Sequence, residues 1–529
     1  MVGDPPDSFI DSCTKITVTL SPPDRSSVSR SVSRATASGD RPLWYGAMAE
    51  PATPFSAQSL PVAEGKIPED LAGTLYRNGP GQLGRDGVRV GHWFDGDGAV
   101  LAVRFGGGAA TATYQYVDTA GRREEEAAGR WLYGNYGMLA AGNWWQRLTE
   151  GRSLKNAANT SVLPLPDRLL ALWEGGRPHR LDLETLATVG LEDFRSDEFA
   201  GLPSDRSYSA HPKIDPVTGE IYNFGMVPGP INQLWLYRSD RTGKLIKQNC
   251  FKLPRLSLTH DFALAGPYLI FCLPPVQLQL LPALLNLKSF SESLEWRPEA
   301  GTRILVFDRE TLELVSRATV EPWFQWHFSH GWCDRDGKVH VGLVGYEDFA
   351  TNQHLQEIAT GDVKTPAAGT LREIIFDPQN PEQLDHKTLV NRHCEFPVIN
   401  PHGNLSTDGP QDIYLSIHHQ DLTNPEQFKS ELFGAIAHYQ TSTDQLTIID
   451  TGTNYYPSEP AVIFDENNQP KYLLTVVYDG DNHCSQVWIF DGRSPEHLQA
   501  GAIAKLQLSS VIPHSFHGVW HSGVRHSKG

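Results

Sequence analysis

The sequence predicts an all-β protein built as a closed β-propeller. From about residue 60 onward, short apolar runs alternate with tight polar turns, the pattern of strands joined by hairpins. The 47 glycines and 37 prolines fit a chain dense in turns. Four histidines in distinctive local frames lie far apart along the chain: His211, His260, His327 and His517. Residues so distant form one site only if a closed, repetitive fold returns the chain to a common axis.

Four segments show the hairpin pattern most clearly, each as strand, turn with Gly, Asn or Asp, and strand. They are LWLYRSDRTGKLIKQ (234–248), ILVFDRETLELVSR (304–317), GWCDRDGKVHVGLV (331–344) and AVIFDENNQPKYLLTVVY (461–478). The chain shows no exact sequence repeat, so a repeat architecture rests on spacing alone. Hairpins recurring over roughly 450 residues favour a sandwich array or a propeller of six to eight blades. Only the propeller has a central axis at which distant strands converge.

The first 45 residues differ in composition from the rest of the chain. They are rich in Ser, Asp, Arg and Pro and lack the apolar core of a secretory signal. The stretch DRSSVSRSVSRATASGDR has the composition of a transit peptide, but Asp4, Asp7 and Asp11 argue against that interpretation. We therefore expect residues 1–45 to be a disordered tail and residues 46–529 to form a single catalytic propeller domain.

Charge and cysteine content restrict the partners and the compartment. The formal net charge of −17 argues against a nucleic-acid partner. The six cysteines are scattered and form no CxxC pair, which fits reduced thiols in a cytoplasmic protein.

One uncharged segment, residues 262–287, interrupts the pattern. Its length could span a bilayer, but its four prolines argue against a regular spanning helix. The part AGPYLIFCL (265–273) predicts a buried strand, and VQLQLLPALLNL (276–287) predicts an apolar loop or a kinked short helix. This second part either packs on the domain surface or forms a membrane-dipping patch or tunnel mouth. We expect peripheral membrane contact through about residues 276–287.

The four framed histidines are candidate metal ligands. His211 lies in SAHPKIDP, His260 in LTHDFAL, His327 in the aromatic run WFQWHFSHGW, and His517 in FHG near the C-terminus. An unpaired imidazole would be costly within that aromatic run. Neutral imidazoles suit iron, zinc or copper. The chain has 20 histidines, and others such as His330 are expected to serve packing or the surface.

Three glutamates also stand in apolar frames: Glu174 in LLALWEGGRPH, Glu395 in HCEFPVINP and Glu459 in YYPSEPAVIF. A buried carboxylate needs a partner. A metal-ligating histidine usually donates its other ring N–H to a carboxylate or a carbonyl. The glutamates are therefore candidates for orienting the histidines; the alternative is that each pairs with an arginine or with backbone amides.

Several frames together resemble the carotenoid cleavage oxygenases, over essentially the whole chain after residue 45. The matching frames are GTLYRNGPG, HWFDGDGAV, LKNAANTSV, LLALWEGGRPHRLD, SAHPKIDP, THDFAL, CEFPVINP, YYPSEPAVI and FHGVW. The segment LALWEGGRPHRL is most similar to the cyanobacterial apocarotenoid-15,15'-oxygenase branch. The resemblance implies a seven-bladed propeller, with loops and short helices forming a dome over one face and a non-haem Fe(II) ion on the axis. It also implies O₂-dependent cleavage of one conjugated double bond of an apocarotenoid or carotenoid into aldehydes such as retinal.

Position by position, the resemblance assigns roles to residues of this chain. The iron ligands would be His211, His260, His327 and His517, and the carboxylates that hold them would be Glu174, Glu395 and Glu459. The substrate tunnel would be lined by Phe94, Trp173, Trp326 and Leu258. Two positions depart from the family pattern: His330 stands where Asn is common, and Leu258 where this branch often has an aromatic residue.

Two other functions fit the same sequence. One is a stilbene-cleaving oxygenase on the same scaffold, which would need polar groups near the cleaved bond to engage a phenol. The other is a metal-free propeller that binds carotenoids or partners without cleaving them. The first differs in substrate and the second in metal content, so each can be tested separately.

Overall fold

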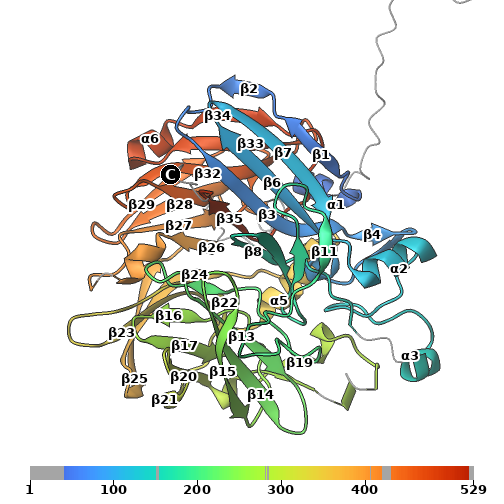
Figure 1. Ribbon diagram of the computed structural model, residues 1–529, viewed down its shortest axis with the longest axis vertical. Coiled ribbons are helices and arrows are strands. Elements are labelled where there is room, and N and C mark those ends of the chain that lie inside the picture. Colours follow the sequence, from blue (N-terminus) through green and yellow to red (C-terminus); the bar gives the residue numbers. More distant parts are fainter. Residues whose placement is uncertain are drawn as a thin grey trace, which may run out of the picture. The chain divides into compact units, whose positions relative to one another are not determined.

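Seven β-sheets of four or more strands form a seven-bladed propeller (Figure 1), which confirms the predicted all-β class. The computed structural model describes residues 41–150, 154–279, 281–282, 285–405, 407–419 and 431–523. All of these residues fall within one compact unit. The predicted hairpins are present as antiparallel pairs, β14–β15, β20–β21, β22–β23 and β31–β32.

Five blades are each built from strands that follow one another along the chain. The first of them contains β8 (Ser161–Leu165), β9 (Arg168–Leu172), β10 (His179–Leu181) and β11 (Thr188–Leu191). The next contains β12 (Lys213–Ile214), β13 (Ile221–Val227), β14 (Asn232–Ser239) and β15 (Leu245–Leu253). The third contains β16 (Ala263–Ala265), β17 (Tyr268–Leu273), β20 (Thr302–Asp308) and β21 (Leu314–Val320). The fourth contains β22 (Phe324–Cys333), β23 (Val339–Tyr346), β24 (Thr370–Asp377) and β25 (Asn380–Val390). The fifth contains β26 (Cys394–Ile399), β27 (Asp412–Ile417), β28 (Ala435–Gln440) and β29 (Gln445–Asp450).

The remaining two blades combine strands from both ends of the chain, and this closes the ring. One contains β1 (Phe55–Ser59), β3 (Gly73–Gln82), β6 (Asp97–Gly106) and β7 (Ala109–Tyr116), with β35 (Gly518–His521) paired to β3. The other contains β30 (Tyr455–Pro457), β31 (Ala461–Phe464), β32 (Pro470–Asp479), β33 (Cys484–Asp491) and β34 (Ala502–Gln507), with β2 (Val62–Gly65) paired to β34. Both ladders run between residues that are more than four hundred positions apart in the sequence.

Neighbouring blades pack face to face through apolar side chains. Ile270 and Val306 of one blade share a buried cluster with Val341 and Ile374 of the next. Each large apolar side chain buried in this way contributes about 1.5–3 kcal/mol relative to its exposed state. Strands between two packed faces are therefore buried along most of their length, as in β17 and β23, which accounts for the short apolar runs that predicted them.

Short helices and two-stranded ribbons are inserted between the strands. Within the described ranges, the α-helices with defined bounds are α1 (Gly46–Ala49), α2 (Ala120–Ala128), α3 (Trp144–Glu150), α5 (Ala350–Ile358) and α6 (Pro495–Gln499). The 3₁₀ helices are η1 (Leu43–Tyr45), η2 (Trp93–Asp95), η3 (Ser291–Ser293), η4 (Pro298–Ala300) and η5 (Pro401–Leu405). The ribbons pair β4 (Gly84–Arg85) with β5 (Val88–Arg89), and β18 (Val276–Leu278) with β19 (Leu294–Trp296). Residues of η2, α5, β18 and β19 line the main cavity, so these insertions cover the functional end of the propeller.

The expected boundary between tail and domain, after residue 45, is a few residues too late. Residues 1–40 lie outside the described part of the chain, but Leu43–Tyr45 form η1. The side chains of Trp44 and Tyr45 are buried, and the Trp44 carbonyl lies 2.9 Å from Nε2 of His514. The polar residues just before Trp44 concealed this apolar anchor in the sequence.

The uncharged segment 262–287 is only partly as expected. Its first part forms β16 and the buried strand β17, as predicted. Its second part does not begin as a surface loop, because Val276–Leu278 form β18 and Val276 is fully buried. Leu281 and Leu287 are exposed, whereas Leu280 and Leu284 lie outside the described residues. Within the described ranges, no helix combines the length and the apolar character needed to cross a membrane.

Candidate metal centre

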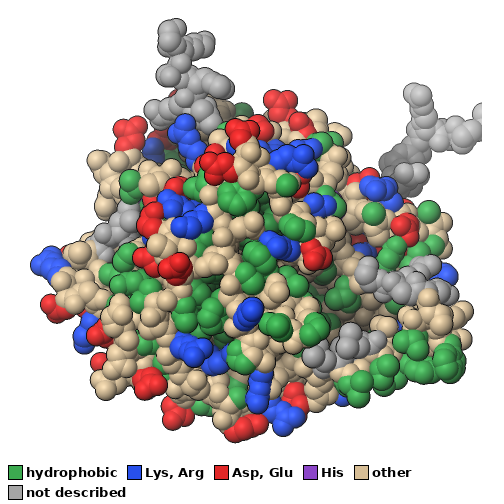
Figure 2. Space-filling view, turned by 60° about the horizontal axis from the view of Figure 1, so that its bottom comes forward, with side chains coloured by type: hydrophobic (Ala, Val, Ile, Leu, Met, Phe, Trp, Pro, Cys, Tyr) green, Lys and Arg blue, Asp and Glu red, His purple; other side chains and the backbone are tan. Residues whose placement is uncertain are grey.

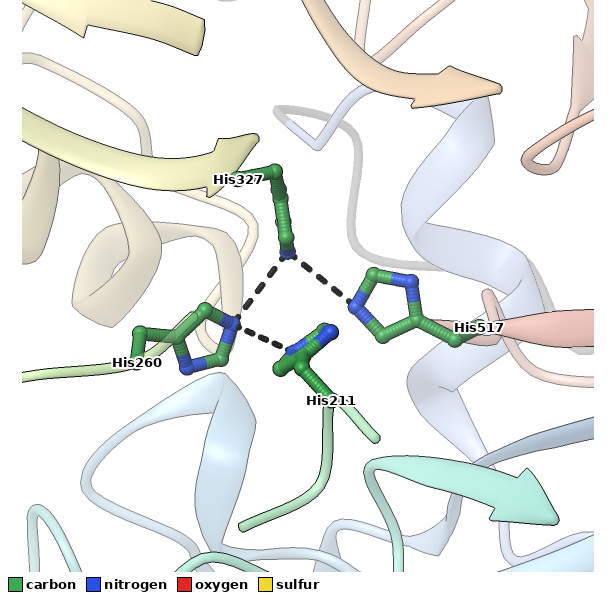
Figure 3. A group of neighbouring side chains, drawn as sticks. All are labelled: His211, His260, His327 and His517. Atoms are coloured by element: carbon green, nitrogen blue, oxygen red, sulfur yellow. Dashed lines mark hydrogen bonds between the residues drawn. The ribbon is translucent and has the colours of Figure 1, made fainter. Parts of the chain in front are cut away.

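Four imidazoles converge at the propeller axis (Figure 3). Nε2 of His260 lies 2.9 Å from Nε2 of His211 and 3.2 Å from Nε2 of His327, which in turn lies 3.1 Å from Nε2 of His517. One ligand atom from each of the four histidines falls within 4.8 Å of all the others. The structure thus brings together all four residues that the sequence singled out.

The inner strands of four blades position these histidines. His211 lies shortly before β12, His260 shortly before β16 and His517 directly before β35, while His327 lies within β22. Each of these strands is at the edge of its sheet, where the blades meet the axis. This explains how residues from distant parts of the chain reach one point.

The other three blades supply the three glutamates. Oε2 of Glu395 lies 2.5 Å from Nδ1 of His327, and Oε1 of Glu459 lies 2.9 Å from Nδ1 of His517. Glu174, in the turn after β9, contacts Nδ1 of His260. Glu395 is in β26, and Glu459 lies between β30 and β31. Each of the seven blades therefore provides one residue of this cluster.

The donor set fits a cation. A carboxylate accepts hydrogen bonds, so the Nδ1 atoms of His260, His327 and His517 carry the protons in the neutral rings. Their Nε2 atoms then present lone pairs, and these lone pairs point toward one another. A metal ion satisfies such an arrangement, and four nitrogen ligands suit iron, copper or zinc.

Burial and the neighbouring carboxylates shift the pKa values of the cluster. Burial, together with the other imidazoles, holds the pKa of His211 well below its ordinary value. Burial also lowers the pKa of His517, against the opposing effect of Glu459. Burial opposes the charged form of His327 too, but Glu395 raises the pKa of that ring above its ordinary value. Burial therefore outweighs the carboxylate at His517, whereas Glu395 outweighs burial at His327.

The glutamates are themselves held by buried partners. Burial would raise the pKa of Glu395, but His327, the Phe396 amide and the Tyr346 hydroxyl hold it below its ordinary value. The Tyr346 hydroxyl donates to Oε1 of Glu395 at 2.8 Å. These contacts leave the Glu395 carboxylate ionised and fixed in orientation.

Glu459 has a different set of partners. Its Oε2 accepts from the Gly518 amide at 2.7 Å and lies 3.4 Å from the buried Arg77 guanidinium. Arg77 and Tyr346 were not predicted from the sequence, since each lies in a strand far along the chain from the glutamate that it contacts.

A cavity of about 320 Å³ opens onto three of the four histidines, His260, His327 and His517. Its wall includes all four of the residues expected to line a tunnel, Phe94, Trp173, Trp326 and Leu258. The Phe94 ring is central, with ring centroids 5.5 Å from Trp326, 5.4 Å from Phe516 and 5.3 Å from Tyr136. Such edge-on aromatic contacts make a rigid, apolar wall.

Several other residues of the cavity wall were not predicted from the sequence. Tyr136, Phe290, Leu278 and Leu294 are apolar or aromatic, and all lie in inserted loops or in the ribbon β18–β19. Three further histidines, His354, His393 and His418, line the same cavity. Rings of Phe433 and Phe396 connect His418 with the metal-site residue His327, with centroids no more than 6.0 Å apart at each step. The sequence around His354, His393 and His418 has no motif or spacing that indicates a shared site, so only the fold shows that they line the cavity.

His330, the residue that departs from the family pattern, belongs to a separate polar group. Its Nε2 lies 3.1 Å from Oε1 of Glu373 on β24, and its Nδ1 lies 2.9 Å from the Ser329 hydroxyl. The same Glu373 carboxylate lies 3.6 Å from Nδ1 of His340. His330 is therefore a buried, paired histidine, as expected for one that serves packing.

Comparisons with known proteins agree with this geometry. A family model described as retinal pigment epithelial membrane protein matches residues 48–522. The apocarotenoid-15,15'-oxygenase of Synechocystis sp. is 33% identical over 470 residues, covering 86% of this chain and 92% of that protein. Resveratrol cleavage oxygenase 1 of Aspergillus fumigatus is 26% identical, covering 92% of this chain and 96% of that protein. A crystal structure of a cobalt-substituted Synechocystis apocarotenoid oxygenase superimposes with a TM-score of 0.80 at 30% identity, covering 90% of this chain and 98% of that one.

Proposed function

The chain belongs to the carotenoid cleavage oxygenase family, and from this premise we propose that it is a non-haem Fe(II) dioxygenase that cleaves an apocarotenoid with O₂. The observation that carries the proposal is the convergence of four Nε2 atoms beside an aromatic cavity. In this proposal His211, His260, His327 and His517 hold the ion. Glu174, Glu395 and Glu459 orient three of these ligands.

The residues of the chain have simple tasks in this reaction. Bound Fe(II) supplies the binding and activation of O₂. The imidazoles are neutral, so they leave the ion its full positive charge. The glutamates keep the Nδ1 protons in place and so keep the Nε2 lone pairs directed inward. Phe94, Trp173 and Trp326 present flat apolar surfaces, which match a rigid polyene in shape and keep water away from reactive intermediates.

Product analysis tests the substrate. We expect a β-apo-carotenal incubated with the iron-loaded protein and O₂ to be cleaved at the 15,15' bond, giving retinal as one of two aldehydes. The reason is the similarity to the Synechocystis apocarotenoid-15,15'-oxygenase together with the aromatic cavity wall. Chromatography of the products, with an intact carotenoid tested in parallel, identifies the cleaved bond. Products from another bond alone would contradict the 15,15' assignment and leave the oxygenase assignment standing.

A second candidate is cleavage of a phenolic stilbene. The observation that favours it is the presence of His354, His393 and His418 on the cavity wall, because imidazoles can hydrogen-bond a phenol. The similarity to resveratrol cleavage oxygenase 1 points the same way. Incubation with a resveratrol-type substrate separates the two candidates. Cleavage of the stilbene without cleavage of any apocarotenal would establish the second and rule out the first.

We also propose that the protein contacts membranes beside the mouth of the cavity. Leu281 and Leu287 are 69% and 54% exposed, and Trp145 on α3 is 65% exposed. The Trp144 indole donates to the Leu285 carbonyl at 2.9 Å, which holds α3 against the segment carrying the two leucines. Leu154, which is also exposed, lines the cavity. Figure 2 shows apolar side chains gathered at the lower right edge of the view. An apolar substrate dissolved in lipid would enter from such a patch.

The triple substitution Trp145→Ser, Leu281→Ser and Leu287→Ser tests this contact. We expect it to lower the fraction of protein that sediments with liposomes and to slow turnover of liposome-borne substrate, because exposed apolar area drives interfacial binding. Turnover of detergent-dissolved substrate should stay near the parent value. Val189→Ser with Val217→Ser, which removes exposed apolar side chains elsewhere, is the matched control. Equal sedimentation of the triple variant and the control would show that the patch only packs on the domain.

A further inference from the structure

A single buried carboxylate connects three of the segments that carry the histidines. Asp261 follows His260 in the chain, and its side chain is almost fully buried. Its Oδ1 lies 2.8 Å from the ammonium of Lys213 and accepts from the Phe262 amide at 2.8 Å. Its Oδ2 accepts from the Phe328 amide at 2.9 Å. Both oxygens are therefore engaged.

The partners of Asp261 come from the segments that hold the other ligands. Lys213 is two residues after His211, and Phe328 is the residue after His327. The three segments lead into or form β12, β16 and β22, which belong to three different sheets. Strand ladders fix positions within a sheet, so contacts between these inner strands must come from other groups. Asp261 supplies such contacts at the level of the ligands.

The chemistry of this contact makes it rigid. The Lys213–Asp261 pair is charge-assisted, with a buried carboxylate and a partly exposed lysine, and the Lys213 ammonium also lies 5.9 Å from the centre of the Phe262 ring. Separating Lys213 from Asp261 would leave a buried charge uncompensated, which is energetically costly. The folded protein therefore favours the geometry that keeps the two charges in contact. A metal site requires its ligands to be held within a fraction of an ångström, and supporting residues provide this precision.

We propose that Asp261 and Lys213 are positioning residues that set the spacing of His211, His260 and His327 around the metal. Unlike the glutamates, Asp261 acts through backbone amides and a lysine rather than through an imidazole. This inference rests on the proposed metal site, since it assigns a role toward the ion held there.

The test measures metal release from Asp261→Asn and Lys213→Met. Each variant is loaded with Fe(II), or with Co(II) as a spectroscopic probe, and then challenged with a chelator. We expect release to be about ten- to a hundred-fold faster than in the parent, as for the loss of a supporting partner. The Co(II) absorption spectrum should also change, because the ligand geometry relaxes. Lys213→Arg, which keeps the charge, should restore slow release.

Lys155→Met is the matched control. Lys155 is a buried lysine whose ammonium lies 2.8 Å from Asp97 and 2.8 Å from Glu125, away from the histidine-bearing segments. Its loss should lower the thermal midpoint and leave metal release and the Co(II) spectrum unchanged. Lys213 is partly exposed, so Lys213→Met keeps the test available if Asp261→Asn does not fold. Parent-like release and spectrum in folded Lys213→Met would overturn the positioning role and leave the metal site intact. Absence of metal from the parent protein would instead refute the proposed function.

Discussion

Alanine at any one of His211, His260, His327 or His517 is expected to strip the metal from the protein and abolish cleavage. Each imidazole supplies one of four converging Nε2 atoms, with the measured contacts between 2.9 and 3.2 Å. Each variant keeps only three of the four direct ligands. Its loss of metal affinity should therefore exceed the roughly ten- to hundred-fold loss that follows removal of a residue hydrogen-bonded to a ligand. Metal analysis of each purified variant and turnover of an apocarotenal measure the two effects separately.

His330→Ala is the matched control for this series. His330 lies on β22, the strand that carries His327, and is equally buried, but its ring is bonded to Glu373 and Ser329. We expect this variant to keep one metal ion per chain, with reduced stability because Glu373 loses a buried partner. Retention of metal in two or more of the four alanine variants would show that the cluster is not the metal site.

The sequence patterns predicted an all-β fold and singled out the four histidines, and the family resemblance added the number of blades. Short apolar runs indicate strands, and the polar clusters between them, such as DRTG (240–243), indicate hairpin turns. Functional polar residues inside apolar frames, such as His327 and Glu459, stand out because burial without a partner would be costly. These signals are local, so they can be read before any contact is known.

The contacts that tie the blades together could not be predicted in this way. The Arg77–Glu459 pair joins β3 to the loop between β30 and β31, and the Asp261–Lys213 pair joins two separate sheets. Neither pair has a sequence spacing that indicates contact. The same holds for α3, whose Trp144 indole meets the Leu285 carbonyl only through the tertiary fold.

Replacing each glutamate with glutamine should lower metal affinity by a different amount, because the hydrogen bonds around the three side chains differ. At Glu395 the amide oxygen can accept from His327 and the Phe396 amide, while the amide NH₂ donates to the Tyr346 hydroxyl. At Glu174 the amide oxygen can face His260, and the rest of the side chain is partly exposed at the cavity. Both variants should keep the Nδ1 proton in place, so we expect metal affinity to fall by about ten-fold.

Glu459→Gln should lower metal affinity more than the other two substitutions. In either orientation of the glutamine amide, its NH₂ group faces another hydrogen-bond donor. Turned one way, its NH₂ group meets the Nδ1 proton of His517; turned the other way, it meets the Gly518 amide and Arg77. The buried guanidinium also loses its carboxylate, at a cost of about 3–5 kcal/mol in stability. We therefore expect metal affinity to fall by about a hundred-fold, with a lower midpoint in urea. Chelator competition and urea unfolding of all three variants measure the order. A Glu459→Gln variant that retains metal as well as Glu395→Gln would contradict it, and would mean that Glu459 serves the fold rather than the orientation of His517.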